Sequence, residues 1–190
     1  AYIAAMLRAK VTLVEKNLMG GDCLNTGCVP SKALLRAATV AQTVRNASDF
    51  GVHCDAPRID FNAVMNHVRG AITNVAPHDS IERYSSLGVN CIKGEAALIS
   101  PWEVEVGGQI ISAKKIIVAT GAAPKALDIP SIEGAPIYNS DTIWQLDKLP
   151  NKLLVLGAGA IGCELAQAFA RLGSDVTVSY THLTLPTSPK

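Results

Sequence analysis

Residues 153–162 read Leu-Leu-Val-Leu-Gly-Ala-Gly-Ala-Ile-Gly. The short apolar run is typical of a buried strand, and the glycines after it have the spacing Gly-x-Gly-x-x-Gly. Gly157 permits a tight turn, Gly159 lets the backbone approach a pyrophosphate, and Gly162 allows close packing between helix and strand. The helix that follows turns its N-terminal amides toward the phosphate charge. This stretch therefore predicts a strand, a turn and a helix that together bind a dinucleotide.

Strands and helices alternate along most of the chain, which predicts an α/β fold with largely parallel sheets. The helices are expected over residues 2–9, 28–46, 61–74, 79–87 and 161–172. The strands are expected over residues 10–14, 89–92, 104–106, 110–111, 116–119, 153–156 and 176–178. A connector with three prolines, residues 121–139, separates two nucleotide-binding units. The predicted domains are an incomplete first one over 1–148, the start of a second over 149–178, and a tail over 179–190.

The composition excludes several classes of protein. Hydrophobic residues make up 48% of the 190 residues and charged residues 17%, and the net charge is +1. No apolar run is long enough for a membrane span, and no basic patch suggests nucleic acid as a partner. Only two of the five cysteines, Cys23 and Cys28, are close in sequence. This spacing of the cysteines favours a protein of the reducing cytoplasm over a secreted protein held together by disulfides.

Both ends of the sequence depart from the pattern of a whole domain. The chain opens on what reads as the second half of a helix, so we expect a fragment that is inactive by itself. After Val178 no acidic or basic residue stands where a ribose 2′ group would be read. NAD and NADP therefore remain open, with Gly162 favouring NAD. The residues from Ser179 resemble foreign sequence joined to a broken reading frame, and we expect an extended, poorly packed tail, an incomplete NAD site and no tight NAD(P)H binding.

Residues 20–32 read Gly-Gly-Asp-Cys-Leu-Asn-Thr-Gly-Cys-Val-Pro-Ser-Lys. A regular helix would hold Cα atoms five residues apart at about 8.6 Å, whereas a disulfide needs less than about 7 Å. If Cys23 and Cys28 bond, Cys23 must lie in an irregular turn while Cys28 begins the helix, where the dipole favours a thiolate. Lys32 lies on the same helix face as Cys28. Zinc ligation, inert thiols and a structural disulfide are the alternatives to redox chemistry.

At these residues the chain resembles the class I pyridine nucleotide–disulfide oxidoreductases, which include dihydrolipoamide dehydrogenase and mercuric reductase. The resemblance extends from Ala1 to about Val178, and Pro30-Ser31-Lys32 is similar to those two branches. Asp22 and Thr26 stand where Thr and Val are commonest. The resemblance implies an FAD-binding Rossmann-like domain followed by an inserted NAD(P)-binding domain.

The resemblance also implies the chemistry. Electrons pass from NAD(P)H through FAD to a disulfide, with Cys28 as the flavin-proximal thiolate and Cys23 as the thiol that attacks the substrate. Lys32 would lie near the flavin and pair with Glu164, a carboxylate in an otherwise apolar helix, which suggests that the pair is buried. The residues expected to contact FAD or NAD(P) are Glu15, Gly21, Asp22, Lys32, Gly94, Ala96, Ala119, Thr120, Gly121, Ser140, Gly157, Gly159, Ile161 and Gly162.

Three classes of substrate remain candidates: a small-molecule disulfide or thiol, a protein-bound disulfide or thiol, and a metal ion. The resemblance implies a homodimeric parent whose acid/base histidine lies outside this chain, and His182 is no substitute for it. No resident metal is expected. A different class of function also remains open, a stand-alone nucleotide-binding module whose cysteine pair acts as a thiol switch.

Overall fold

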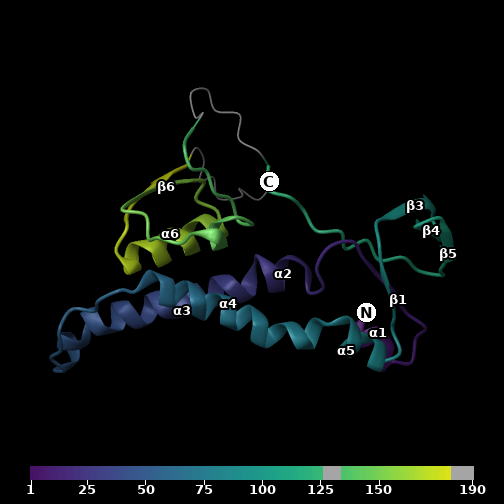
Figure 1. Ribbon diagram of the computed structural model, residues 1–190, viewed down its shortest axis with the longest axis horizontal. Coiled ribbons are helices and arrows are strands. Elements are labelled where there is room, and N and C mark those ends of the chain that lie inside the picture. Colours follow the sequence, from purple (N-terminus) through teal and green to yellow (C-terminus); the bar gives the residue numbers. More distant parts are fainter. Residues whose placement is uncertain (126–133, 181–190) are drawn as a thin grey trace, which may run out of the picture. The chain divides into compact units, whose positions relative to one another are not determined.

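The computed structural model describes residues 1–125 and 134–180 (Figure 1). Contacts between residues divide them into two compact units. The first unit contains Ala1–Asn25 and the described residues from 72 to 125, and the second contains Thr26–Ala71 and residues 134–180. The expected α/β class is confirmed. In residues 1–125 and 134–180, no helix is both long and apolar enough to cross a membrane.

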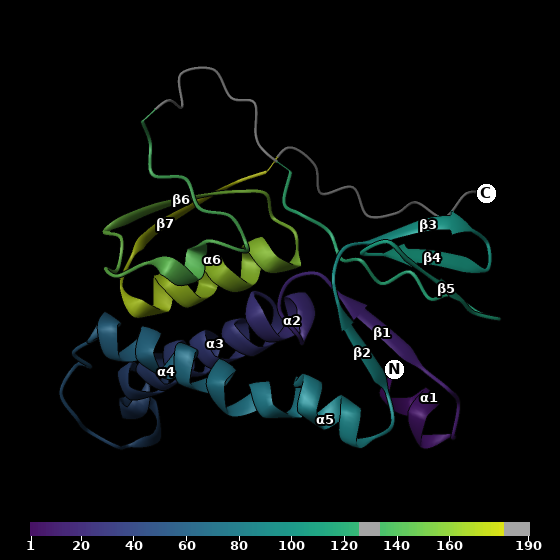
Figure 2. The ribbon, with the colours of Figure 1, turned by 45° about the vertical axis from the view of Figure 1, so that its right-hand side comes forward.

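The first unit contains a parallel pair of strands, β1 (Thr12–Glu15) and β2 (Asn90–Lys93), which lie side by side in Figure 2. Their register pairs Glu15 with Lys93, so both residues stand at the carboxyl end of the pair. The short helices α1 (Tyr2–Met6), α2 (Gly21–Asn25) and α5 (Ile81–Ser86), with the 3-10 turn η2 (Ala76–Asp79), complete this part. The strand predicted at 89–92 is thereby confirmed.

An antiparallel sheet of three strands follows in the same unit. It consists of β3 (Ala96–Ser100), β4 (Glu103–Val106) and β5 (Gln109–Ser112). The sequence pattern predicted strands at β4 and β5 but not at β3, and it did not predict antiparallel pairing. The two-residue loop Gly107–Gly108 explains the pairing of β4 with β5, because both glycines have positive φ, as a tight hairpin requires.

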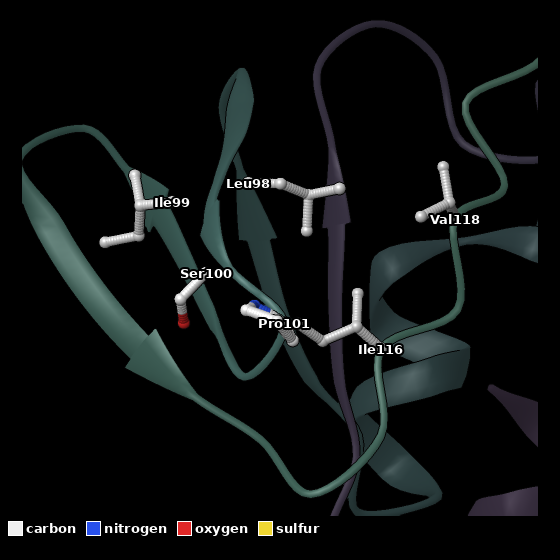
Figure 3. A pocket seen from close by; sticks show the side chains of 6 residues that line it. All are labelled: Leu98, Ile99, Ser100, Pro101, Ile116 and Val118. Carbon is white, nitrogen blue, oxygen red and sulfur yellow. The ribbon is translucent and has the colours of Figure 1, made fainter.

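Residues 116–119 form no strand, which corrects the prediction that they do, so the predicted cofactor residues Ala119, Thr120 and Gly121 do not end one. Ile117 is 86% exposed, although its apolar neighbours suggested a buried strand. A strand needs a neighbouring backbone for its hydrogen bonds, and no described strand pairs with this segment. Ile116 and Val118 instead face Leu98 and Pro101 across an open apolar pocket (Figure 3).

The second unit is built around the predicted glycine-rich stretch. Strands β6 (Lys152–Leu156) and β7 (Asp175–Ser179) pair in parallel, and helix α6 (Ala160–Leu172) connects them. Helix α3 (Cys28–Arg45) packs against α6, followed by η1 (Ala47–Phe50). Helix α4 (Phe61–Val75) and the turn η3 (Ile143–Gln145) add to the same core. These helices and strands agree closely with the predicted ranges.

The core of the second unit explains why α3 and α6 lie together. Small residues on α3, including Ala38, leave room for the bulky side chains of α6 and α4. Phe169 is 1% exposed, and its ring centroid lies 6.1 Å from that of Phe61. Gly173, with φ of 116°, ends α6 as a left-handed cap and directs the chain into β7. The outcome is a fixed pairing of two helices that carry predicted site residues.

Candidate functional site

The glycine-rich turn between β6 and α6 has the geometry that its sequence predicts. Gly157 has φ of 107°, which a residue with a side chain rarely adopts. A Cβ at Gly162 would lie 2.2 Å from the carbonyl oxygen of Gly157, so only glycine lets the helix approach the strand this closely. A Cβ at Gly159 would meet nothing within 4 Å, which leaves open space beside the start of α6. Ile161, in the first turn of the helix, is 61% exposed.

Two glycine substitutions should therefore differ clearly in their effect on stability. Gly162→Ala is expected to lower the free energy of unfolding by about 1–3 kcal/mol, because the added methyl group overlaps the Gly157 carbonyl. Gly159→Ala should leave stability within about 0.5 kcal/mol, because the methyl group enters open space. Urea unfolding of the two variants measures both effects. Equal stability of the two variants would contradict the proposed close approach of α6 to the turn.

The expected ion pair between α3 and α6 is present within the second unit. Lys32 Nζ lies 3.0 Å from Glu164 Oε1 and 3.1 Å from Glu164 Oε2. Lys32 is four residues after Cys28 on α3, and Glu164 is two residues after Gly162 on α6. The ion pair therefore joins the helix that begins with a cysteine to the helix that follows the glycine-rich turn.

The burial predicted for this pair is wrong. The side chain of Lys32 is 62% exposed and that of Glu164 is 41% exposed. Glu164 lies on the rim of the apolar face of α6, whereas the residues that enter the core are Ala166, Ala168, Phe169 and Leu172. An exposed ion pair contributes about 0–1 kcal/mol to stability. Packing, and not this pair, therefore holds α3 and α6 together.

The two cysteines of the motif lie in different compact units, Cys23 in the first and Cys28 in the second. Cys23 lies in the short helix α2, not in the irregular turn expected for it, because Asn25 stabilises one helical turn by donating to the carbonyls of Gly21 and Met19. The irregular backbone comes later, at Thr26 and Gly27. Cys28 begins α3 as predicted, and its thiol is exposed and free. Their pairing stays a prediction.

The carboxyl end of the β1–β2 pair forms a second candidate site, in the first unit. A pocket of about 200 Å³ is lined there by Glu15 and Lys93 and by apolar residues, including Leu13 and Ile81. Glu15 Oε1 accepts a hydrogen bond of 2.8 Å from the backbone amide of Asn17, which orients the carboxylate. A ligand is expected at this end of a parallel pair, where a carboxylate can accept from a ribose hydroxyl.

The other predicted cofactor residues in the first unit differ in their contacts and exposure. Asp22 and Gly121 are in contact, since a Cβ at Gly121 would lie 2.9 Å from Asp22 Oδ2. The side chain of Val106 explains why residue 94 is a glycine, because a Cβ at this position would lie 2.8 Å from a methyl group of Val106. Gly21 has φ of 56° at the start of α2. Ala96, Ala119 and Thr120 are exposed.

Ser140, the remaining predicted residue, accepts a hydrogen bond from Trp144, a residue that no sequence motif had indicated. The indole Nε1 of Trp144 donates to the carbonyl oxygens of Ser140, at 2.8 Å, and of Thr26, at 2.9 Å. No sequence pattern links Trp144 to the cysteine motif, because 118 residues separate it from Thr26. Within residues 1–125 and 134–180, no group of three or more His, Cys, Asp or Glu residues is arranged to hold a metal ion.

A family model described as "Pyridine nucleotide-disulphide oxidoreductase" matches residues 1–186. A mercuric reductase of Bacillus cereus is 37% identical over 178 residues, covering 94% of this chain and 28% of that protein. "Dihydrolipoyl dehydrogenase 2" of Haloarcula marismortui is 38% identical over 189 residues, covering 93% of this chain and 39% of that protein. The chain thus spans between about a quarter and two fifths of the length of these relatives.

The fold is similar to that of a solved flavoprotein. The "HOCl-induced flavoprotein disulfide reductase RclA from Escherichia coli" superposes with a TM-score of 0.76 at 30% sequence identity. The match covers 94% of this chain and 38% of that chain. Sequence and structure comparisons therefore identify the same group of proteins.

Proposed function

Because the chain belongs to the pyridine nucleotide-disulphide oxidoreductase family, we propose that it carries the dithiol centre of an FAD-dependent enzyme and the opening of its NAD(P) domain. The observation that carries the proposal is the Lys32–Glu164 ion pair. It links the helix that begins at Cys28 to the helix that follows the nucleotide-binding turn. In the proposed division, residues 1–148 belong to the FAD domain and residues 149–178 to the NAD(P) domain.

The two cysteines perform the exchange with the substrate. Bound FAD would supply the two electrons, taken from NAD(P)H, that reduce the Cys23–Cys28 disulfide to a dithiol. The Cys23 thiolate then attacks one sulfur of a disulfide substrate, forms a mixed disulfide and releases one thiolate. The Cys28 thiolate attacks Cys23 Sγ, which restores the protein disulfide and releases the second substrate thiolate. The exposed position of Cys28 at the start of α3 suits this role.

The described residues fit the two cofactors at separate places. Glu15, with its oriented carboxylate beside the 200 Å³ pocket, would hold the adenosine ribose of FAD. Asp22 and Gly121, in contact with each other, would lie along the same cofactor. The open space at Gly159 and the amides of the first turn of α6 would receive the pyrophosphate of NAD(P). NAD and NADP both remain candidates.

The substrate class follows from the attacking group. A thiolate reacts with electrophilic sulfur and binds thiophilic metal ions, so both a disulfide and a metal ion suit the same dithiol. The names of the relatives, mercuric reductase and dihydrolipoyl dehydrogenase, cover these two chemistries. We further propose a homodimeric enzyme in the cytoplasm, where reduced thiols persist.

Replacing Lys32 with methionine tests the role of the ion pair. In a full-length protein that contains this segment, reduction of the flavin by NADH should slow by about tenfold or more, because the charge near the flavin is lost. The free energy of unfolding should fall by only about 0–1 kcal/mol, since the pair is exposed. Stopped-flow absorbance of the flavin measures the rate.

A matched control is available in the first unit. Lys16 pairs with Glu95 at 3.5 Å, with both side chains more than half exposed. Lys16→Met removes an exposed ion pair of the same kind and should leave flavin reduction unchanged. If Lys32→Met and Lys16→Met gave the same rate as the unaltered protein, the proposed role of Lys32 would be lost.

A further inference from the structure

Trp144 connects two backbone segments with a single hydrogen-bond donor. Its indole N–H is shared between the carbonyl oxygens of Ser140 and Thr26, at 2.8 and 2.9 Å. The side chain is half-buried and packs against the core of the second unit. An indole has no other donor, so this bifurcated bond uses its entire polar capacity. The indole N–H therefore links the backbone at Thr26 to the backbone at Ser140.

The carbonyl of Thr26 lies in the short irregular segment between α2 and α3. Helix α2 ends at Asn25 and helix α3 begins at Cys28, which leaves Thr26 and Gly27 outside both helices. Gly27, the N-cap of α3, has φ of −110° and ψ of −112°, and no side chain caps the helix there. A helix without a side-chain cap frays more readily at its first turn. The hydrogen bond from Trp144 therefore restrains the peptide group immediately before α3.

Trp144 is itself held by a rigid turn. The Asn139 side-chain oxygen accepts from the backbone amides of Asp141, at 2.9 Å, and of Thr142, at 3.1 Å. Ile143, next to the tryptophan, is 7% exposed and belongs to the core of the unit. An internally bonded turn on one side and a buried neighbour on the other fix where the indole lies. Trp144 can thus transmit the position of this turn to the start of α3.

We infer that Trp144 is a positioning residue for the dithiol, which holds Cys28 in place at the start of α3 by anchoring the Thr26 carbonyl. The inference rests on the proposed function, because it assigns the residue a part in the same redox reaction. Cys28 is exposed at the first position of α3, where the amides of the first turn favour its thiolate, and the bond from Trp144 to Thr26 restrains this turn. Removing the N–H group therefore destabilises the dithiol relative to the disulfide.

Trp144→Phe keeps an aromatic ring and removes the donor. The reaction to measure is the reduction of the protein disulfide by two molecules of reduced glutathione, which yields the dithiol and one glutathione disulfide. The equilibrium constant for reduction should fall about tenfold, equivalent to about 30 mV for this two-electron couple. Trp102, the other tryptophan of the chain, is 58% exposed, and Trp102→Phe is the matched control. Equal constants for the two variants would overturn the inference.

A second measurement does not depend on disulfide formation. In a Cys23→Ser background, the alkylation rate of Cys28 is compared with that of Cys163, an exposed thiol of the same unit. Trp144→Phe should lower the Cys28 rate about threefold relative to Cys163, because looser first-turn amides stabilise the thiolate less well. An unchanged ratio overturns the inference.

The two measurements separate this inference from the proposed function. If no variant forms a Cys23–Cys28 disulfide with glutathione, the proposed redox function fails, and the alkylation ratio still decides whether Trp144 positions Cys28. If the disulfide forms normally but both variants behave alike in both measurements, only the role of Trp144 fails.

Discussion

Phe169→Ala is expected to destabilise the second unit by about 3–5 kcal/mol, which is the typical cost of removing a fully buried aromatic side chain. Phe169 is 1% exposed and packs against Phe61 from a different helix. It also belongs to the cluster of buried residues that joins α6 to α3. The loss should appear in urea unfolding monitored by circular dichroism. It should be accompanied by loss of the close approach of Lys32 to Glu164.

Phe50→Ala is the matched control for this prediction. Phe50 is 84% exposed at the end of η1, so the same substitution there should change stability by less than about 0.5 kcal/mol. A Phe169→Ala variant as stable as the Phe50→Ala variant would show that the core does not place α3 against α6. The geometry of the candidate site would then lose its structural basis.

Cys28→Ser is expected to lower NADH-dependent disulfide reduction by about a thousandfold or more in a full-length protein that contains this segment, because the restoring thiolate is lost. A serine hydroxyl cannot form a disulfide, so a mixed disulfide at Cys23 would have no intramolecular route of release. Mass spectrometry should detect this trapped species with a disulfide substrate. The flavin should still be reduced by NADH, since that step precedes the dithiol.

Cys163→Ser controls for the loss of an exposed thiol. Cys163 lies on α6 and its thiol is 3.4 Å from the carbonyl oxygen of Ala158, outside the motif of residues 20–32. Turnover should remain within about twofold of the unaltered protein, because no step of the exchange uses this sulfur. Turnover retained by Cys28→Ser, or lost equally by both variants, would contradict the assigned roles.

Local patterns predicted the elements that carry the site. The helix predicted at residues 28–46 and the glycine spacing of residues 157–162 depend on interactions within a few residues of each other. The structure accordingly contains α3, β6, α6 and β7 close to the predicted positions. The Lys32–Glu164 pair joins residues 132 apart and was predicted only through the family resemblance.

Features that depend on distant partners were missed. Residues 116–119 have strand-forming side chains but no pairing strand among the described elements, so local propensity gave the wrong answer. Glu164 stands within an apolar sequence, yet its place on the rim of α6 leaves it partly exposed. The tie from Trp144 to Thr26 depends on packing that no local pattern encodes. The expectations for residues 181–190, including His182, lie outside the described residues.

If Cys23 and Cys28 form one redox-active disulfide, mapping of the disulfide bonds in the oxidised chain should find it. The chain is equilibrated with glutathione disulfide, its remaining thiols are alkylated, and its peptides are identified by mass spectrometry. We expect a single intramolecular bond between Cys23 and Cys28, with Cys54, Cys91 and Cys163 alkylated. Alkylation of Cys23 and Cys28 to the same extent as the other three cysteines would contradict it.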